Sequence, residues 1–295
     1  MEYQFINICG LGFVGGSVSY LCRKNSTAYS GYDIVLKNDS DAVAIYNDIK
    51  QLISNSEQNN DVNFYFICVP TPMGIEGECN TTIVEKVVGQ LFAHHQKQTI
   101  VLIKSTVQPG TCRKLFERYS NNLFKIAFVP EFLTERRANL DMYEAKFAMI
   151  GTHDGKENDH ITNLMKRLYK HNSALECITR KYEACEIFKY TINCFLGVKV
   201  WFFNEVYELC EKFNIEYDQL RHLLPLDPRI GMSHTLVPGP DGGFGFSGTC
   251  IPKDLSGFQY LQNQLDIPNT VLSDIFKRNK EIRKKPVPPS NIRNF

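Results

Sequence analysis

The N-terminal end of the chain carries the pattern that restricts the fold most. An apolar run over residues 5–9 leads into Gly10-Leu11-Gly12-Phe13-Val14-Gly15, and a helical pattern follows as far as Arg23. In a G-x-G-x-x-G turn the glycines permit a tight turn, close approach of a pyrophosphate and close packing of the helix on the strand. The N–H groups at the start of such a helix also attract phosphate. The pattern therefore predicts a strand, turn and helix that bind a dinucleotide.

An acidic residue follows at the distance that this kind of site requires. The second predicted strand, around residues 31–34, contains Asp33, roughly 20 residues beyond the glycines. A carboxylate there accepts hydrogen bonds from the ribose hydroxyls of NAD and repels the additional phosphate of NADP. The alternative is that Asp33 is an ordinary turn residue. The sequence predicts NAD as the cofactor, with contacts from Gly10, Gly12, Phe13, Val14, Gly15 and Asp33.

Strand patterns recur along the next part of the chain and alternate with helical ones. We expect strands over residues 62–69, 99–103, 125–129, 146–150 and 174–178, and helices over residues 82–95 and 157–171. Near-continuous apolar strands are typical of a parallel sheet that is covered on both faces. Ligands of such sheets bind beyond the carboxyl ends of the strands, where we expect the loops with Val69, Thr71 and Thr106. The fold class predicted for residues 1–180 is α/β, an N-terminal Rossmann-type doubly wound parallel sheet.

A long helical pattern over residues 182–213 opens the second part of the chain. It has no proline and is apolar on most faces, which indicates a buried helix between domains or subunits. Lys189 and Asn193 lie one turn apart on it, either as a lysine that reaches solvent and a capped amide or as a functional pair with a buried partner. Shorter helices are expected over residues 217–224, 253–265 and 271–285. We predict an all-helical domain with a long central helix over residues 181–285 and a flexible tail over residues 286–295.

Composition and charge exclude several classes of protein. With 43% apolar and 22% charged residues in a chain of 295, the protein can bury the cores of two domains, and disorder is not expected. The net charge of +1 gives no support for a nucleic-acid or anionic-membrane partner. No apolar stretch of about 18 residues predicts a membrane span, and no targeting leader is expected.

Cysteine usage indicates a reducing compartment. The ten cysteines include no C-x-x-C pair, and several lie within predicted apolar strands or helices, which argues against a disulfide framework and against a zinc site. The seven histidines show no metal-ligand spacing with each other or with the cysteines, so no metal is predicted. We therefore expect a cytoplasmic protein.

A short stretch near the C-terminal end gathers residues that can carry chemistry. Residues 245–254 contain small residues followed by Cys250, Lys253 and Asp254. Small residues let a loop bring its backbone close to a ligand. A thiol at a helix start, with a lysine three residues on, lies in a positive field that raises its thiolate fraction, and Asp254 can hold or activate a water. The alternative is that Cys250 is a small buried hydrophobic residue beside a glycine turn.

This stretch resembles a known active-site signature. Gly248-Thr249-Cys250-Ile251-Pro252-Lys253-Asp254 is similar to that of the UDP-glucose/GDP-mannose 6-dehydrogenase family, and the chain is most like the UDP-glucose 6-dehydrogenase branch. The blocks Ser105-Thr106-Val107, Pro130-Glu131-Phe132-Leu133 and Lys189-Tyr190-x-x-Asn193 follow in the family's order. The resemblance extends over most of the chain, from Phe5 to about Arg283.

The resemblance implies an enzyme that oxidises a nucleotide sugar by four electrons with NAD. The catalytic residues that it implies are Cys250, Lys189, Asp254, Asn193, Thr106 and Glu131. For a UDP-sugar substrate it implies Glu131, Phe132, Leu133, Thr134, Lys189, Asn193, Arg229 and Ser247, and for NAD it adds Val69, Thr71, Thr106, Glu135 and Lys253. The family's equivalent of Arg229 reaches the sugar of a neighbouring subunit, which favours a homodimer. Polysaccharide biosynthesis is the expected context.

The implied reaction passes through a covalent adduct on Cys250. The first oxidation of the C6 alcohol gives an aldehyde, the thiolate attacks it to form a thiohemiacetal, and the second oxidation gives a thioester. Water positioned by Asp254, Thr106 and Glu131 hydrolyses the thioester, while Lys189 stabilises the oxyanions.

Several positions depart from the family pattern. Ser247 stands where a glycine is expected, Val129 where an asparagine is usual, and Arg136-Arg137 where a small glycine-containing stretch is usual. The family normally adds a third domain, so we expect a short form that lacks the C-terminal nucleotide-binding domain. Two other interpretations stay open. A two-domain 3-hydroxyacid dehydrogenase shares the size, the Rossmann domain and a lysine–asparagine pair but needs no cysteine loop, and a non-catalytic remnant would bind NAD alone.

Overall fold

The structure is a computed structural model that describes residues 4–36, 39–268 and 270–286. It divides into two compact units. Unit 1 comprises Met1–Pro72 and Cys79–Lys189, and unit 2 comprises Met73–Glu78 and Tyr190–Phe295. The division falls within α7 (Tyr182–Lys212), which begins in unit 1 and continues in unit 2. The domain boundary after residue 180 stays a prediction, and residues 287–295 of the predicted tail lie outside the described part of the chain.

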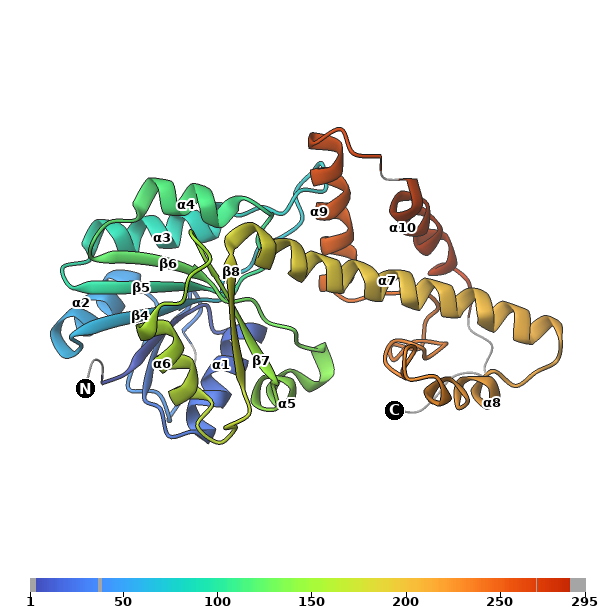
Figure 1. The fold of residues 1–295 in the computed structure, drawn as a ribbon, viewed down its shortest axis with the longest axis horizontal. Helices are drawn as coiled ribbons and strands as arrows, with labels where there is room; N and C mark the ends of the chain where they lie inside the picture. Colours follow the sequence, from blue (N-terminus) through green and yellow to red (C-terminus); the bar gives the residue numbers. More distant parts are fainter. Residues whose placement is uncertain (1–3, 37–38, 269, 287–295) are drawn as a thin grey trace. The chain divides into compact units, whose positions relative to one another are not determined.

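Unit 1 is built on one sheet with the strand order β3-β2-β1-β4-β5-β6-β7-β8 (Figure 1). The chain winds outward from β1 to β3, returns to the centre at β4 and then winds the other way, which is the topology of a doubly wound sheet. This confirms the predicted fold class. The strands are β1 (Ile6–Cys9), β2 (Tyr29–Tyr32), β3 (Ile45–Tyr46), β4 (Val62–Ile67), β5 (Gln98–Ile103), β6 (Phe124–Phe128), β7 (Phe147–Thr152) and β8 (Glu176–Lys181).

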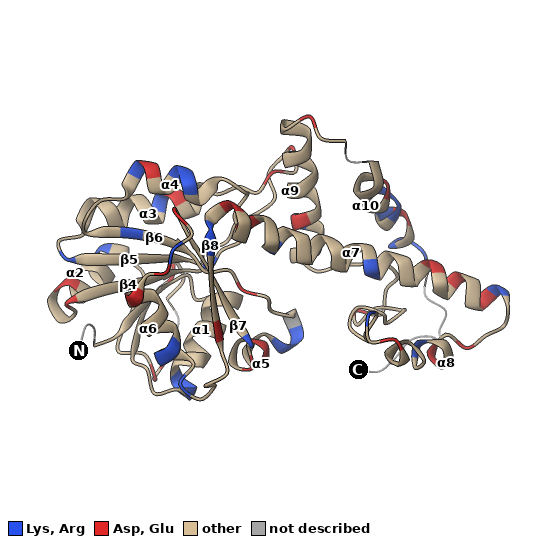
Figure 2. Ribbon diagram, viewed as in Figure 1, with Lys and Arg blue, Asp and Glu red and all other residues tan. Residues whose placement is uncertain are grey.

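Helices cover both faces of this sheet (Figure 1). Phe64 and Phe66 of β4 pack on one face, and Tyr65 and Ile67 pack on the other. Because both faces are buried, the central strands need apolar residues at nearly every position. β1, β4 and β5 accordingly contain no charged residue, and β4 and β5 are drawn in tan in Figure 2. One face carries α1 (Phe13–Lys24), α5 (Ala138–Tyr143) and α6 (Asp159–Leu168), and the other carries α2 (Ile49–Asn59), α3 (Thr82–His94), α4 (Thr111–Tyr119) and the start of α7.

One strand pairing differs from the all-parallel sheet that the sequence predicts. β6 and β7 are antiparallel, with Phe128 opposite Gly151, whereas β7 and β8 are parallel to each other. The connection between β6 and β7 contains the short turn η1 (Glu135–Arg137) and the six-residue helix α5. A parallel crossover has to carry the chain back along the sheet, and a helix of this length rises only about 9 Å. The predicted direction of the last two strands is therefore wrong.

Besides α5, two helices and a short strand of unit 1 are additional to the sequence prediction. α2 buries Ile49, Leu52, Ile53 and Ser56, which is the spacing of one helix face. Its first turn is capped by Asp48, whose carboxylate accepts a hydrogen bond from the N–H of Lys50. The other two elements are α4 and β3, which is only two residues long. The signals for α2 were therefore present in the sequence, whereas β3 is too short to produce a periodic pattern.

Unit 2 consists of helices and loops, and its described residues contain no strand. Besides α7 it contains α8 (Tyr217–Arg221), the turn η2 (Leu224–Leu226), α9 (Cys250–Gln264) and α10 (Thr270–Ile282). α7 is less buried than its apolar sequence predicts, because Phe195, Phe202 and Leu209 are exposed within this single chain. Among the described residues, no helix combines the length and hydrophobicity that a membrane span requires.

Candidate active site

The glycine turn between β1 and α1 has the geometry of a phosphate cradle. Gly10 has a φ of +91°, and a Cβ there would lie 2.7 Å from the carbonyl oxygen of Cys68. A Cβ on Gly15 would lie 1.8 Å from the carbonyl oxygen of Gly10. β1 and α1 can therefore approach each other this closely only because residue 15 has no side chain. At Gly12 a Cβ would meet nothing within 4 Å, and no side chain caps the start of α1. The turn therefore leaves room for a pyrophosphate at the helix start.

Asp33 lies beside this turn, directly after β2. Its Oδ2 accepts a hydrogen bond from the N–H of Leu11 at 2.7 Å, and its Oδ1 accepts one from the N–H of Val35 at 3.1 Å. A carboxylate at this edge, next to the glycine turn, is the acceptor for ribose hydroxyls in dinucleotide-binding folds. The cradle and the carboxylate together fit NAD.

The loops after β4 and β5 are joined at Thr106. Its carbonyl oxygen accepts a hydrogen bond from Oγ1 of Thr71 at 2.8 Å and another from the thiol of Cys79 at 3.3 Å. Oγ of Ser105 donates to the carbonyl oxygen of Val69 at 2.7 Å. The predicted residues Val69, Thr71 and Thr106 therefore lie on two connected loops at one edge of the sheet. No sequence pattern pointed to Cys79 as a partner of Thr106.

A buried ion pair joins the start of α7 to the loop after β6. Nζ of Lys189 lies 3.0 Å from Oε1 of Glu131 and donates to its carbonyl oxygen at 2.6 Å. The two side chains are 3% and 6% exposed. Oε2 of Glu131 accepts from the N–H of Leu133 at 2.7 Å, and the ammonium lies 5.4 Å from the centre of the Phe132 ring. Lys189 is thus a buried lysine with a carboxylate partner rather than one that reaches solvent.

The rest of this loop turns outward. The N–H of Thr134 donates to Oδ2 of Asp141 at 2.8 Å. The side chain of Glu135, a predicted cofactor contact, lies outside the described part of the structure. Arg137 approaches Asp141 at 3.6 Å and Glu144 at 3.2 Å, so two carboxylates already neutralise its charge.

In unit 2, Cys250 occupies the first turn of α9, which begins three residues before the predicted start at Lys253. Pro252 fits in this turn because the first residues of a helix need no intrahelical N–H bond. None of the ten cysteines forms a disulfide, and Cys250 is the exposed one. A thiol in the first helical turn lies at the positive end of the helix dipole, which favours the thiolate. Among the described residues, no cluster of His, Cys, Asp and Glu is able to hold a metal ion.

Asp254 lies one turn further along α9 and is 1% exposed. Its Oδ1 accepts a hydrogen bond from Nζ of Lys253, and its Oδ2 accepts one from Nδ2 of Asn193 on α7, both at 2.5 Å. The structure therefore brings three predicted residues together in unit 2. A buried carboxylate with a donor on each oxygen has a fixed orientation.

Two buried asparagines that the sequence analysis did not single out hold the loop before Cys250. Oδ1 of Asn204 on α7 accepts from the N–H of Gly245 at 2.9 Å. Asn279 on α10 accepts from the N–H of Phe246 at 2.8 Å and donates to the carbonyl oxygen of Phe246 at 2.9 Å. A polar residue on an apolar helix face requires a partner when it is buried, and this was the signal available in the sequence.

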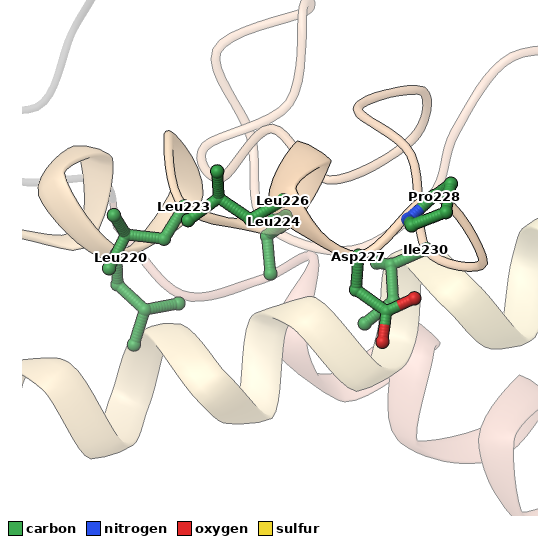
Figure 3. A pocket seen from close by; sticks show the side chains of 7 residues that line it. All are labelled: Leu220, Leu223, Leu224, Leu226, Asp227, Pro228 and Ile230. Carbon is green, nitrogen blue, oxygen red and sulfur yellow. The ribbon is translucent and has the colours of Figure 1, made fainter.

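Ser247 and Arg229 are exposed. The Arg229 side chain is 87% exposed and pairs with Asp227 at 2.6 Å. Asp227 in turn lines a cavity of about 560 Å³, shown in Figure 3, whose other lining residues are Leu220, Leu223, Leu224, Leu226, Pro228 and Ile230. The predicted sugar contact thus stands beside a leucine-lined hollow of unit 2.

Fold and site together define a dinucleotide-binding protein of the dehydrogenase class. Two consecutive family models match the chain. They are the UDP-glucose/GDP-mannose dehydrogenase family, NAD binding domain, over residues 39–173, and the UDP-glucose/GDP-mannose dehydrogenase family, central domain, over residues 183–281. The chain belongs to this family. The resemblance seen in the sequence and NAD as the cofactor are thereby confirmed.

Individual relatives agree with this assignment. The chain is 32% identical to a UDP-glucose 6-dehydrogenase of Rickettsia conorii over 232 residues, which are 78% of this chain and 51% of that relative. It spans about half the length of the first curated relatives that it matches.

Two solved structures share the fold. A UDP-glucose dehydrogenase from the archaeon Pyrobaculum islandicum matches with a TM-score of 0.75 and 23% identity, over 95% of this chain and 68% of that chain. A 3-hydroxyisobutyrate dehydrogenase from Mycobacterium tuberculosis matches with a TM-score of 0.68 and 15% identity, over 95% and 93%.

Proposed function

We propose that this chain is an NAD-dependent oxidoreductase that converts UDP-glucose to UDP-glucuronate. The observation that carries the proposal is the exposed thiol of Cys250 in a first helical turn, with the buried carboxylate of Asp254 one turn away. Oxidation of an alcohol to an aldehyde needs no thiol, whereas oxidation to the acid is eased by a nucleophile that holds the carbon. Family membership and the R. conorii relative support a UDP-sugar as the substrate.

Unit 1 would hold NAD. The glycine turn, with Phe13 and Val14, would take the pyrophosphate, Asp33 the ribose, and the loops with Thr71 and Thr106 the far end of the dinucleotide. When bound, NAD supplies a hydride acceptor for each of the two oxidations. Glu135 and Lys253 stay predicted contacts of the cofactor.

The thiol of Cys250 links the two oxidations. The C6 alcohol loses a hydride and a proton to give an aldehyde, and the thiolate adds to the aldehyde carbon to give a thiohemiacetal. Loss of a second hydride and a proton leaves a thioester. One water then adds to the thioester carbon, the C–S bond breaks, and the carboxylate leaves while the thiolate is regenerated. One turnover therefore consumes one water and releases two hydrides.

The charged pairs supply donors and a base for these steps. An ammonium has three N–H donors, and among the described residues Lys189 uses two of them, both on Glu131. The third is available to an oxyanion in a site that excludes water, where such a donor acts most strongly. Asp254, oriented by Asn193, would position the water and accept its proton. The part of Thr106 and Glu131 in positioning this water stays a prediction from the family resemblance.

We also infer a homodimer. Phe195, Phe202 and Leu209 follow one another at seven-residue intervals on α7 and are 63%, 55% and 59% exposed. Seven residues are about two helical turns, so these side chains form one apolar stripe. A second copy offers the same stripe, as a symmetric interface requires. The reduced state of the cysteines supports a cytoplasmic location, and a uronic acid product supports a place in polysaccharide biosynthesis.

A 3-hydroxyacid dehydrogenase is the second candidate. The fold of the M. tuberculosis 3-hydroxyisobutyrate dehydrogenase matches 95% of this chain with a TM-score of 0.68. Such an enzyme would use Lys189 and Asn193 in a two-electron oxidation and would leave Cys250 without a role.

The stoichiometry of NAD reduction separates these functions. We expect two NADH per UDP-glucose consumed in a panel of UDP- and GDP-sugars, and complete inhibition by iodoacetamide. One NADH per 3-hydroxyisobutyrate, insensitive to alkylation, would establish the second candidate. Binding of NAD without reduction of NAD by any substrate would establish the non-catalytic remnant.

Replacement of the thiol tests the covalent step directly. Cys250→Ser should release no UDP-glucuronate, because a serine hydroxyl is a far weaker nucleophile than a thiolate. Cys177→Ser, at a half-buried position on β8, is the matched control and should keep two NADH per sugar. Normal release of UDP-glucuronate by Cys250→Ser would refute the proposal.

A further inference from the structure

The Thr106 loop, residues 104–110, joins β5 to α4, and the helix that it enters has no cap of its own. The N-cap residue Gly110 has no side chain, and the first turn of α4 contains no acidic residue. The first N–H groups of a helix have no partner within the helix. A Ser, Thr, Asp or Asn at the N-cap position usually supplies the acceptor. The start of α4 therefore depends on an acceptor from another part of the fold.

Glu186, in the second turn of α7, supplies this acceptor. Its Oε2 accepts a hydrogen bond from the N–H of Gly110 at 2.6 Å, and its Oε1 accepts one from the N–H of Cys112 at 2.9 Å. Glu186 is fully buried. Burial raises its pKa, while hydrogen bonds from these two N–H groups and from the thiol of Cys112 lower it in part. Burying a carboxylate is costly, so its use in place of an ordinary N-cap side chain favours a role beyond capping.

The Thr106 loop is attached to the rest of unit 1 on both sides of Thr106. The carbonyl oxygen of Thr106 accepts hydrogen bonds from Thr71 and Cys79, which lie on the loop after β4. Glu186 holds the N–H of Gly110, four residues further along the chain. The first attachment belongs to the loops of the predicted cofactor site themselves. The second comes from α7, which gives this helix control over the path of the loop beyond Thr106.

The same part of α7 also holds the neighbouring loop. Glu186 and Lys189 are three residues apart, so they share one face of the helix. Lys189 binds Glu131 in the loop after β6, and β6 is the parallel neighbour of β5. The first turns of α7 therefore fix two adjacent loops at the carboxyl edge of the sheet, one through a carboxylate and the other through an ammonium group.

We propose that Glu186 is a positioning residue for the nicotinamide half of NAD, which it places through the Thr106 loop. The inference rests on the proposed function, in which the loops with Thr71 and Thr106 take the far end of the dinucleotide. The adenosine half belongs to the glycine turn and Asp33, which lie on the β1–β3 side of the sheet. Glu186 acts on backbone N–H groups of the other side, so its influence falls on one half of the cofactor.

Calorimetric titration with NAD and with ADP tests this division. ADP contains the adenosine and the two phosphates of NAD but lacks the nicotinamide and its ribose. A glutamine at position 186 offers one acceptor, and its NH₂ group faces the second backbone N–H, so the end of the loop loses part of its attachment. We expect Glu186→Gln to weaken NAD about 5-fold and ADP less than about 2-fold.

Two matched controls separate positioning from a general loss of stability. Glu183→Gln breaks the ion pair of Glu183 on α7 with Arg113 on α4, at 2.9 Å, and leaves the cap of α4 in place. Asn60→Ala removes the acceptor of the N–H of Phe5 before β1, at the opposite edge of the sheet. Both controls should leave the ratio of the NAD and ADP affinities unchanged.

A second variant at the same position keeps the test decisive. Glu186→Asp retains the charge but is too short to reach both N–H groups, and it should show the same selective loss of NAD even if Glu186→Gln fails to fold. Equal losses of NAD and ADP, no loss of either, or a selective loss of NAD in either control would overturn the positioning role and leave the dehydrogenase function standing. A wild type that binds neither ligand would instead contradict the proposed function.

Discussion

Among the described residues, each unit contains one lysine–carboxylate pair whose carboxylate is buried, and the two pairs differ in how far the lysine is enclosed. In unit 1 both members are sealed, with Lys189 3% and Glu131 6% exposed. In unit 2 Asp254 is equally buried at 1%, but Lys253 is 16% exposed. A charge that is sealed depends on its partner, because water cannot replace the lost interaction, whereas a lysine at the surface keeps its hydration. In unit 1 the fold therefore depends on both members of the pair. In unit 2 it depends mainly on the carboxylate of Asp254, because Lys253 stays hydrated.

The second donor to each carboxylate sharpens this difference. Glu131 receives it from the backbone N–H of Leu133, which every side chain at that position except proline retains, and Asp254 receives it from the side chain of Asn193. Asp254 thus retains a strong neutral donor when its lysine is lost. The orientation of Glu131 is fixed by its own loop, and that of Asp254 by the packing of α7 on α9 within unit 2.

The largest effect should come from breaking the sealed pair. Lys189→Met leaves the Glu131 carboxylate buried without its cation and should lower the free energy of unfolding by about 3–5 kcal/mol. Urea unfolding followed by circular dichroism measures this. Glu131→Met/Lys189→Met should recover at least about half of the loss, since two apolar side chains replace the pair. A double variant as unstable as the single one would show that the loss comes from packing and that the comparison of the pairs is mistaken.

The sequence predicted the members of both pairs but not their pairing. Lys189, Glu131, Asn193 and Asp254 each came from short family blocks, and the need of a buried lysine for a partner followed from the apolar pattern of the helix. Which carboxylate pairs with Lys189 depends on where the fold places the loop after β6, which contains Glu131. That information lies in the tertiary packing, outside any local pattern.

The fold shows the same division between local and long-range information. The glycine turn, the buried strands and the 31-residue helix α7 were predictable because each has a strong period or motif. The reversal at β7 was not, because strand direction depends on the length and path of a connection that contains only short helical pieces. Asn204 and Asn279 likewise bind the loop before Cys250 from more than 30 positions away in the sequence, so no local pattern predicts these contacts.

A second test compares how the two units hold a loop with a buried asparagine. In unit 2 Asn279 bonds to both the N–H and the carbonyl of Phe246, and in unit 1 Asn60 does the same with Phe5. Asn279→Ala and Asn60→Ala should each lower the free energy of unfolding by about 2 kcal/mol, because two backbone groups of Phe246 lose their partner in the first variant and three, of Gln4 and Phe5, in the second. Only Asn279→Ala should change the rate at which iodoacetamide alkylates Cys250, measured by peptide mass spectrometry under native conditions.

The two asparagine variants control for each other. If both variants are equally destabilised but only Asn279→Ala changes the alkylation rate of Cys250, then Asn279 positions the thiol. A general loss of stability would change the rate in both variants. If Asn60→Ala changed the alkylation rate to the same extent, the reactivity of Cys250 would report global stability, and Asn279 would have no special role in positioning its loop.

The exposed lysine of the second pair should matter less. Lys253→Met leaves Asp254 with its hydrogen bond from Asn193 and should lower the free energy of unfolding by about 1 kcal/mol or less. Urea unfolding beside Lys189→Met gives the contrast between the two lysines in one experiment. A loss as large as that of Lys189→Met would mean that enclosure of the lysine does not set the dependence of a pair on its cation.

The smallest effect is expected where both partners of a pair are exposed, as in Arg283–Asp241, whose side chains are 31% and 34% exposed at 2.7 Å. Desolvation raises the pKa of Asp241, but hydrogen bonds from Arg283, Ser247 and the N–H of Gly243 lower it further, to about 2. The pKa is thus lower in the folded state than the value of about 3.9 in an unfolded chain. The stability from this pair is present above about pH 4 and is lost as the pH falls through about 2.

Solvent screening limits this contribution to less than about 1 kcal/mol at neutral pH. Asp241→Asn should therefore differ from wild type in free energy of unfolding at about pH 6, and the difference should shrink as the pH is lowered toward about 2. Urea titrations at both values measure it. If the difference were the same at both values, Asp241 would act as a hydrogen-bond acceptor whatever its charge. The exposed pair Arg283–Asp241 would then not differ from the sealed pair Lys189–Glu131 in the way that its exposure predicts. In the sealed pair, the buried charge of each member requires the opposite charge of the other.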